Sequence, residues 1–188
     1  VMSTTLWLIR HGETEWTISG QHTGRTDIAL TENGRKQALS LKSRLEHQNF
    51  DQVFTSPLQR AHETCVLAGL GEQAQIEPDL MEWNYGVYEG LTTPEILKAE
   101  PDWSLWTSDV ENGETAAQVQ KRVSGLLERL TAQEGTIALF AHGHILRSLI
   151  GVWIHNDVRL GENLALDTAS VSVLDVHRGA RVLRRLNA

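Results

Sequence analysis

The stretch Leu6-Trp7-Leu8-Ile9-Arg10-His11-Gly12 determines the fold, because an apolar run ends there in a charged pair followed by glycine. Such a run of consecutive apolar residues predicts a short buried strand. A second histidine has the same setting at Ala141-His142-Gly143, again after an apolar segment. Two strands of this kind would carry both histidines at their carboxyl ends. The pattern therefore predicts one pocket that holds two imidazoles, the first of them beside an arginine.

Outward from these two motifs, helical and extended patterns alternate along the chain. Apolar residues three or four positions apart predict helices, whereas short apolar or alternating runs predict strands. Strands are predicted at 6–9, 52–55, 136–141, 170–176 and 181–186. Helices are predicted at 31–45, 56–68, 114–130 and 143–150, and a further helix begins at 93–95. Ser56 is predicted to be an N-cap and Pro57 the first helical residue, because a hydroxyl accepts an unpaired N–H and proline has none to lose.

This alternation predicts an α/β fold with a largely parallel sheet. Ligands of such folds bind outside the carboxyl ends of the strands. Three polar segments follow predicted strands at that edge, namely 10–11, 56–60 and His142. The length of 188 residues indicates a single domain over 1–188, with a small insert at about 83–113.

The composition is that of an ordinary soluble globular chain, with 40% hydrophobic and 22% charged residues and a formal net charge of -7. This charge argues against nucleic acid and anionic membranes as partners, although a local arginine cluster can still bind a small anion. No apolar run approaches the ~18 residues of a membrane span, and the first residues lack the basic segment of a signal peptide. We therefore expect a cytoplasmic location. The single cysteine, Cys65, allows no intrachain disulfide and is expected to be buried and structural.

The polar residues at the strand ends suit chemistry on a phosphate monoester, which is a dianion at neutral pH. Without a metal ion the dianion needs two or more cationic donors, for which Arg10, Arg60 and a protonated His142 are candidates. His11 can then attack phosphorus through one neutral ring nitrogen, while the other nitrogen donates to a backbone carbonyl. The leaving oxygen needs a proton, and Glu82, with its apolar sequence neighbours, is the candidate donor.

Other interpretations of these residues stay open at this level. His142 and His144 have the spacing of a metal pair on one face of a strand. Arg60 is also compatible with a surface salt bridge, and Glu89 and Glu13 are the next candidates for the acid. The remaining histidines belong to no recognisable group and are expected to be structural or solvated: His22, His47, His62, His155 and His177.

Five segments spread over residues 6–147 form a set of motifs: 8–16, 23–34, 56–64, 82–90 and 141–147. Through them the chain resembles the histidine phosphatase superfamily, in its phosphoglycerate-mutase-like branch. The resemblance implies a three-layer α/β/α sandwich around a mostly parallel sheet, with no metal or other cofactor. It also implies that His11 becomes phosphorylated and that Glu82 donates the proton. Arg10, Arg60 and His142 would hold the phosphate. Thr23 and Gly24 match a segment that contacts the phosphate or the substrate.

Three departures from the mutases of this branch favour a phosphatase. Thr17 replaces the usual asparagine, the insert at 91–113 has no arginine for a substrate carboxylate, and the chain is short. A mutase has to shield its phosphohistidine from water, which a small lid would do poorly. We therefore expect hydrolysis of small phosphorylated metabolites, either sugar phosphates or phosphoglycerate-like acids. The segment 19–24 is similar to that of sugar-bisphosphate phosphatases.

Two other functions stay as alternatives: a cofactor-dependent phosphoglycerate mutase, and a protein that binds a phosphorylated ligand without turnover. The intact set of five polar site residues argues against the second. Many relatives form dimers, so a homodimer is compatible with the resemblance, although no apolar stripe in this sequence requires one.

Overall fold

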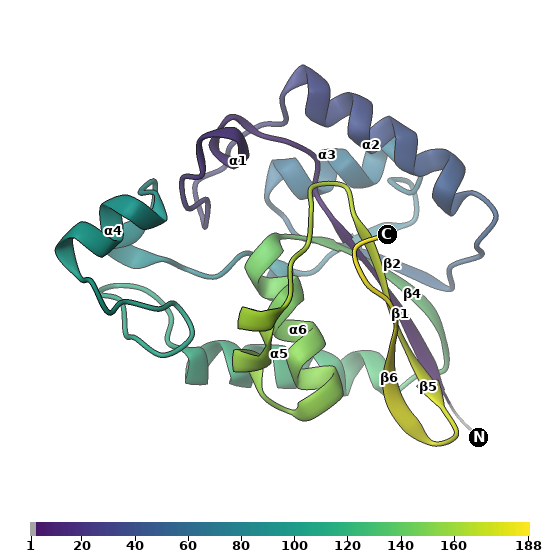
Figure 1. The fold of residues 1–188 in the computed structure, drawn as a ribbon. Coiled ribbons are helices and arrows are strands. Elements are labelled where there is room, and N and C mark those ends of the chain that lie inside the picture. The colour runs from purple at the N-terminus through teal and green to yellow at the C-terminus, as the bar shows by residue number, and fades with distance from the viewer. Residues whose placement is uncertain (1–2) are drawn as a thin grey trace.

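The first apolar run forms β1 (Thr4–Arg10), an inner strand of a six-stranded sheet in the computed structural model, which describes residues 3–188 (Figure 1). It pairs in parallel with β4 (Gly135–Ala141), and the register places Arg10 opposite Ala141. His11 and His142 therefore leave the sheet side by side at its carboxyl edge. The prediction that these two motifs end neighbouring strands is confirmed.

The sheet has the order β3-β2-β4-β1-β5-β6. β2 (Gln52–Thr55) runs parallel to β4, and β3 (Ala74–Ile76) runs parallel to β2. β5 (Val171–His177) is antiparallel to β1, and β6 (Ala180–Arg185) returns antiparallel to β5. Three of the five strand pairings are parallel and two are antiparallel, which confirms the predicted mostly parallel sheet.

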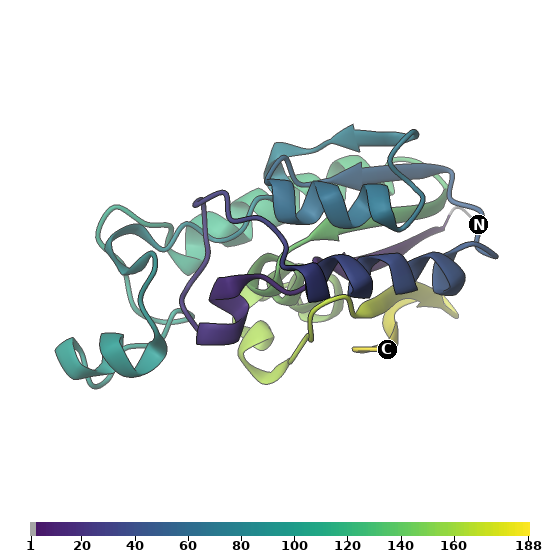
Figure 2. The same ribbon diagram turned by 90° about the horizontal axis from the view of Figure 1, so that it is seen from above.

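Helices cover both faces of this sheet, as Figures 1 and 2 show. Ile9 and Phe140 pack on one face with residues of α2 (Glu32–Leu45) and α3 (Gln59–Leu67). Leu8 and Leu139, one position earlier on the same strands, pack on the opposite face with α5 (Ala116–Thr131) and α6 (Gly143–His155). Side chains that alternate between two buried faces are expected of a covered sheet, and the predicted three-layer sandwich is confirmed.

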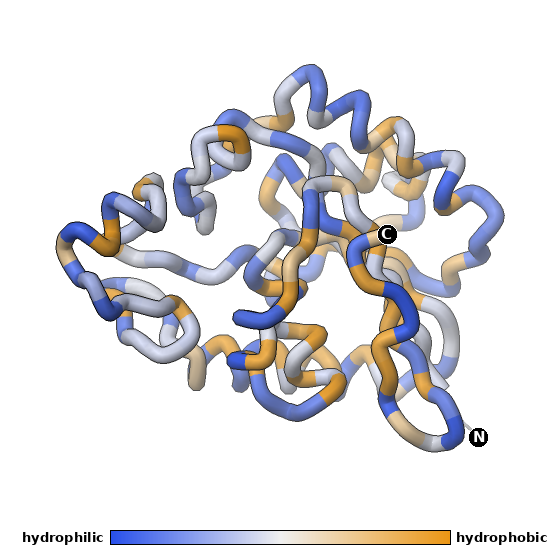
Figure 3. Tube along the Cα trace, viewed as in Figure 1, coloured by the Kyte–Doolittle hydropathy of each residue, from blue (hydrophilic) through white to orange (hydrophobic). Residues whose placement is uncertain are grey.

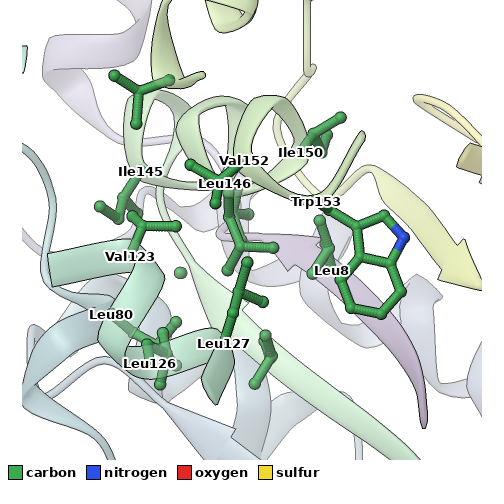
Figure 4. Packing of buried hydrophobic residues seen from close by; sticks show 14 of the residues in the cluster. Leu8, Leu80, Val123, Leu126, Leu127, Ile145, Leu146, Ile150, Val152 and Trp153 are labelled. Atoms are coloured by element: carbon green, nitrogen blue, oxygen red, sulfur yellow. The ribbon is translucent and has the colours of Figure 1, made fainter. Parts of the chain in front are cut away.

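The core between the sheet, α5 and α6 is packed mainly with aliphatic side chains, together with the Trp153 ring (Figure 4). Val123 and Leu127 of α5 contribute to it with Leu146 and Ile150 of α6, and all four are 2% exposed or less. α2 alternates between hydrophobic and hydrophilic segments along its length (Figure 3), as a helix with one buried face does. Cys65 is fully buried in the core on the α2 side, as predicted.

The helix starts differ from prediction at two positions. α3 begins at Gln59 with Leu58 as its N-cap, so the prediction that Ser56 caps this helix is wrong. The Ser56 hydroxyl instead bonds to His142 and accepts from the Leu58 amide. α4 (Thr93–Ala99) is capped by Thr92, one residue earlier than the predicted start signal.

Several short elements were not expected from the sequence. α1 (Glu15–Ser19) follows β1, and three single-turn or short 3₁₀ helices occur at Pro78–Leu80, Gly86–Tyr88 and Val158–Asn163. Their periods are too short to recognise by apolar spacing. α1 and α4 lie beyond the carboxyl edge of the sheet (Figure 1). Within residues 3–188, no helix combines the length and apolar character needed to cross a bilayer.

Candidate active site

A pocket with a volume of about 250 Å³ opens at the carboxyl edge of the sheet. Arg10, His11, Thr23 and Glu82 line it. His142 and Arg60 lie behind this lining with no exposed surface, and the His11 and His142 ring centroids are 5.2 Å apart. The structure therefore brings together six of the seven predicted site residues, His11 among them.

His11 is 4% exposed, and its Nδ1 lies 2.7 Å from the carbonyl oxygen of Gly12. A carbonyl only accepts, so Nδ1 carries the proton and Nε2 keeps its lone pair. Burial, followed by the charges of Arg60 and Arg10, holds the pKa of His11 well below its usual value. The imidazole is thus neutral and oriented by a backbone carbonyl, as predicted, and its role as the nucleophile stays a prediction. No larger residue fits at Gly12, because a Cβ there would lie 2.4 Å from the Gly34 carbonyl oxygen.

His142 differs from its predicted state. Burial, with Arg60 and His11 nearby, keeps the pKa of His142 well below its usual value, so the ring is neutral rather than cationic. Its Nε2 lies 2.8 Å from the Ser56 hydroxyl, and its buried Nδ1 has no hydrogen-bond partner. His142 is therefore not the protonated donor considered from the sequence, because its burial, and then the arginines that would hold an anion, disfavour a positive charge on the ring.

The two arginines are anchored by backbone carbonyls. Arg10 donates through Nη1 to Leu166, and Arg60 donates to the carbonyls of Thr23, Gly24 and Thr26 at 2.8–3.0 Å. Each retains a buried Nε without a partner. Burial is the main cause that lowers the pKa of both guanidinium groups. The alternative of a surface salt bridge for Arg60 is wrong, since its side chain is fully buried.

The loop that carries Thr23 and Gly24 is held from two sides. Arg60 binds its carbonyls, while the Glu89 carboxylate accepts from the amides of Gly24 and Thr26 at 2.9–3.1 Å. Thr23 lines the pocket, whereas the Gly24 amide is already bound to Glu89. Glu89, an alternative acid at the level of the sequence, thus positions this loop.

Glu82 reaches the pocket from the segment after the 3₁₀ helix Pro78–Leu80. Its carboxylate accepts from the amides of Trp83, His144 and Ile145 at 2.8–3.0 Å. Two of these amides belong to the first turn of α6, where N–H groups lack partners within the helix. Polar backbone groups, rather than the apolar neighbours considered from the sequence, therefore define its surroundings.

Sequence reasoning missed four aromatic side chains and one arginine that also line the pocket: Trp16, His22, Tyr85, His144 and Arg147. The expectation that His22 belongs to no group is wrong. His142 and His144 do not act as a pair, because they bond to Ser56 and Tyr85 respectively. Between residues 3 and 188, no group of three His, Cys, Asp or Glu side chains is arranged to hold a metal ion. The one sequence signal that pointed to His22 was the similarity of segment 19–24 to that of sugar-bisphosphate phosphatases.

Comparisons with known proteins cover nearly the whole chain. The sequence profile of the histidine phosphatase superfamily (branch 1) matches residues 6–188. An acid phosphatase of Mycobacterium tuberculosis is 39% identical over 184 residues, which cover 95% of this chain and 89% of that protein. Sedoheptulose 1,7-bisphosphatase of Saccharomyces cerevisiae is 35% identical over 178 residues, covering 78% of this chain and 66% of that protein.

Solved structures show the same similarity. The product of an open reading frame of Mycobacterium tuberculosis superposes with a TM-score of 0.91 at 38% sequence identity. The superposition covers 98% of this chain and 97% of that one. The similarity therefore includes the sheet, its helices and the segments beyond the carboxyl edge.

Proposed function

The chain belongs to branch 1 of the histidine phosphatase superfamily, and from this premise we propose that it hydrolyses phosphate monoesters of small metabolites. Two relatives of this chain are named as phosphatases, one of them a sugar bisphosphatase. The proposed route is a covalent phosphohistidine on His11, with no metal ion. The proposed phosphate-binding residues are Arg10, Arg60, His142 and Thr23, with Gly24 acting through the loop that Arg60 and Glu89 hold.

One observation carries this proposal. Among residues 3–188, four buried side-chain atoms that can hydrogen-bond lack a partner, and three of them are nitrogens of Arg10, Arg60 and His142. An unpartnered buried polar group costs roughly 1–3 kcal/mol, so such atoms are uncommon unless a ligand completes them. The oxygens of a phosphate are acceptors of the charge and geometry that guanidinium groups bind best.

In the first step, His11 Nε2 attacks phosphorus, and the bond between phosphorus and the ester oxygen breaks. The Nδ1–H bond to Gly12 keeps the lone pair on Nε2 and orients the ring. The proton of a protonated Glu82 carboxyl passes to the leaving oxygen, which departs as an alcohol. The products of this step are the phosphohistidine and the Glu82 carboxylate.

In the second step, the Glu82 carboxylate takes a proton from water, and the water oxygen attacks phosphorus. The bond between phosphorus and Nε2 then breaks, which returns neutral His11, protonated Glu82 and inorganic phosphate. Arg10 and Arg60 stabilise the charge on the transferring group in both steps, and their backbone anchors keep them fixed while the charge moves.

A mutase would form the same phosphohistidine. It would then transfer the phosphoryl group back to a bound acid, whereas a phosphatase transfers it to water. The insert at 83–113 supplies Thr93 and Tyr85 to the pocket but no arginine. Its one basic residue, Lys98, is not among the residues that line the pocket, so a substrate carboxylate there would lack a cation from the insert. This observation favours hydrolysis.

The test is phosphate release, with EDTA present, from sugar phosphates, phosphoglycerates and an activated aryl phosphate. We expect release by the parent chain and by His47→Gln, a control at an exposed histidine. His11→Ala should lose at least about 1,000-fold in kcat, as enzymes deprived of their nucleophile do. Exchange between phosphoglycerate isomers that exceeds phosphate release would favour the mutase instead. Near-normal rates in folded His11→Ala would overturn the covalent route.

A further inference from the structure

A second group of side chains, His22, Tyr85 and His144, lies on one wall of the pocket and has no part in the chemistry proposed above. The rings of His22 and His144 are parallel within 3°, with centroids 6.1 Å apart. The Tyr85 ring meets each of them edge to face, at 4.9 and 5.5 Å. We call these three residues the aromatic wall. They come from a loop, the start of the insert and the first turn of α6.

Tyr85 fixes the tautomer of His144. Its hydroxyl is hydrogen-bonded to His144 Nδ1, and Tyr85 is 2% exposed. Burial raises the pKa of Tyr85 well above its usual value, so the phenol keeps its proton. No other acceptor for this O–H is present among the described residues, and an unpaired buried O–H is costly. Tyr85 therefore donates to Nδ1, and the neutral His144 ring carries its proton on Nε2 as a donor.

The hydrogen bond of His22 selects the opposite tautomer. Its Nδ1 lies 2.7 Å from the carbonyl oxygen of Leu91, which accepts only. The tautomer that this contact selects has its proton on Nδ1 and a lone pair on Nε2. The aromatic wall thus offers one acceptor, His22 Nε2, and one donor, the N–H of His144.

The wall stands beside the proposed acid. The backbone amide of His144 donates to Glu82 Oε2 at 3.0 Å, and Tyr85 follows Glu82 by three residues. A leaving oxygen that receives its proton from Glu82 must lie against this carboxyl. The carbon atoms attached to that oxygen then extend within the same pocket, which His22 and His144 also line.

We propose that the aromatic wall is a leaving-group subsite that selects phosphate esters of hydroxyl-rich alcohols, such as sugar phosphates, over esters of carboxylic acids. A hydroxyl group donates and accepts at once, which matches one acceptor and one donor on the same wall. A carboxylate only accepts and would face the lone pair of His22. Arg147 lines the same pocket, but its Nε donates to the Gly161 carbonyl and its guanidinium lies over the Trp106 ring. This inference rests on the proposed phosphatase function and narrows its substrate class.

The tautomers can be measured without any turnover, from the ¹⁵N chemical shifts of the imidazoles in the full chain. We expect His22 protonated on Nδ1 and His144 protonated on Nε2. In Tyr85→Phe, His144 should lose this preference and show both tautomers, while His22 keeps its own. His144 protonated on Nδ1 in the parent chain would overturn the inference, as would an unchanged His144 signal in folded Tyr85→Phe.

The selectivity is tested with sorbitol 6-phosphate and n-hexyl phosphate, which share a six-carbon chain and differ in hydroxyl groups, and with 3-phosphoglycerate. We expect the parent chain to prefer the sorbitol ester in kcat/KM. His22→Phe and His144→Phe should each reduce that preference about tenfold, the contribution of one or two hydrogen bonds. His47→Gln, at an exposed position, is the matched histidine control.

The outcomes separate this inference from the proposed function. Phosphate release with an unchanged sorbitol preference in both folded variants would overturn the subsite and leave the phosphatase proposal standing. A larger loss on 3-phosphoglycerate than on the sorbitol ester would assign the wall to carboxylates, which also overturns it. If the parent chain releases no phosphate from any ester, the phosphatase proposal fails, and the subsite fails with it.

Discussion

The two ends of the pocket are built in different ways. The phosphate end, formed by Arg10, His11, Arg60 and His142, follows core strands or lies in a core helix, and Arg60 and His142 are fully buried. The leaving-group end is the aromatic wall of His22, Tyr85 and His144. Two of its residues belong to loops beyond the sheet, and only His144 lies on a core helix.

This difference indicates a division of labour. In the proposed function, residues fixed by the sheet meet the group that every substrate shares, which is the phosphate. Residues on loops meet the part that differs between substrates, and loops can change without disturbing a core. Variants at the phosphate end should therefore lower activity on all esters alike, whereas variants at the aromatic wall should act according to the leaving group.

A large effect, equal for every ester, is expected for Arg60→Ala. Removing a buried charged donor should lower kcat by about 10²–10³-fold, equally for sugar and aryl phosphates. Steady-state kinetics on both ester classes measures it, with Arg159→Ala, at an exposed arginine, as the control. A thermal melt establishes that the variant is folded, because three carbonyls also lose their donor. Normal kinetics in the folded variant would make Arg60 purely structural.

Glu82→Gln stands between the two ends and should separate substrates by leaving group. An alkoxide needs a proton and an activated aryl oxide does not, so alkyl esters should lose about 10²–10⁴-fold and aryl esters far less. The measurement is kcat/KM over a series of esters of increasing leaving-group pKa. A uniform loss across the series would move the acid role to another residue.

The buried histidines predict how stability depends on pH. Burial lowers the pKa of His11, His142 and His144 below the ordinary value of 6.5, so protons bind better to the unfolded chain. Above pH 6.5 these histidines are neutral in both the folded and the unfolded chain, so they do not change the stability. Below pH 6.5 the unfolded chain binds protons first, and the free energy of unfolding falls as the pH drops. Each group contributes up to about 1.4 kcal/mol per pH unit.

Urea unfolding of the parent chain and of His142→Gln between pH 5 and 7.5 tests this linkage. As the pH falls, the free energy of unfolding of His142→Gln should drop less steeply than that of the parent chain. The difference should be about the contribution of one histidine. The exposed His47→Gln should keep the parental slope. Equal slopes for all three proteins would contradict a depressed pKa at His142.

The smallest effect is expected from metal removal. Arg10 and Arg60 supply the positive charge at the phosphate end, so dialysis against EDTA should leave kcat/KM unchanged for every ester. Activity assayed before and after chelation, and again after addition of zinc or magnesium, measures this. A loss that zinc restores would return the His142 and His144 metal hypothesis to consideration.

The sequence predicted the phosphate end better than the leaving-group end, for a physical reason. His11 and His142 follow the apolar runs of two strands, and the register of neighbouring parallel strands brings such ends together. The aromatic wall brings together positions 22, 85 and 144. The loop conformations that do so cannot be predicted from the spacing of apolar residues. The state of His142 and the role of Ser56 were mispredicted for a related reason. Both depend on burial and on a hydrogen bond between residues 86 positions apart.

The central claim, that His11 carries the phosphate, is tested most directly by trapping the intermediate. Rapid acid-free quenching after mixing with a radiolabelled aryl phosphate, followed by peptide mapping, locates the label. We predict a base-stable, acid-labile phosphoryl group on the peptide that contains His11, in the parent chain and not in His11→Ala. A label on another residue, or full turnover with no labelled protein at any quench time, would contradict the account.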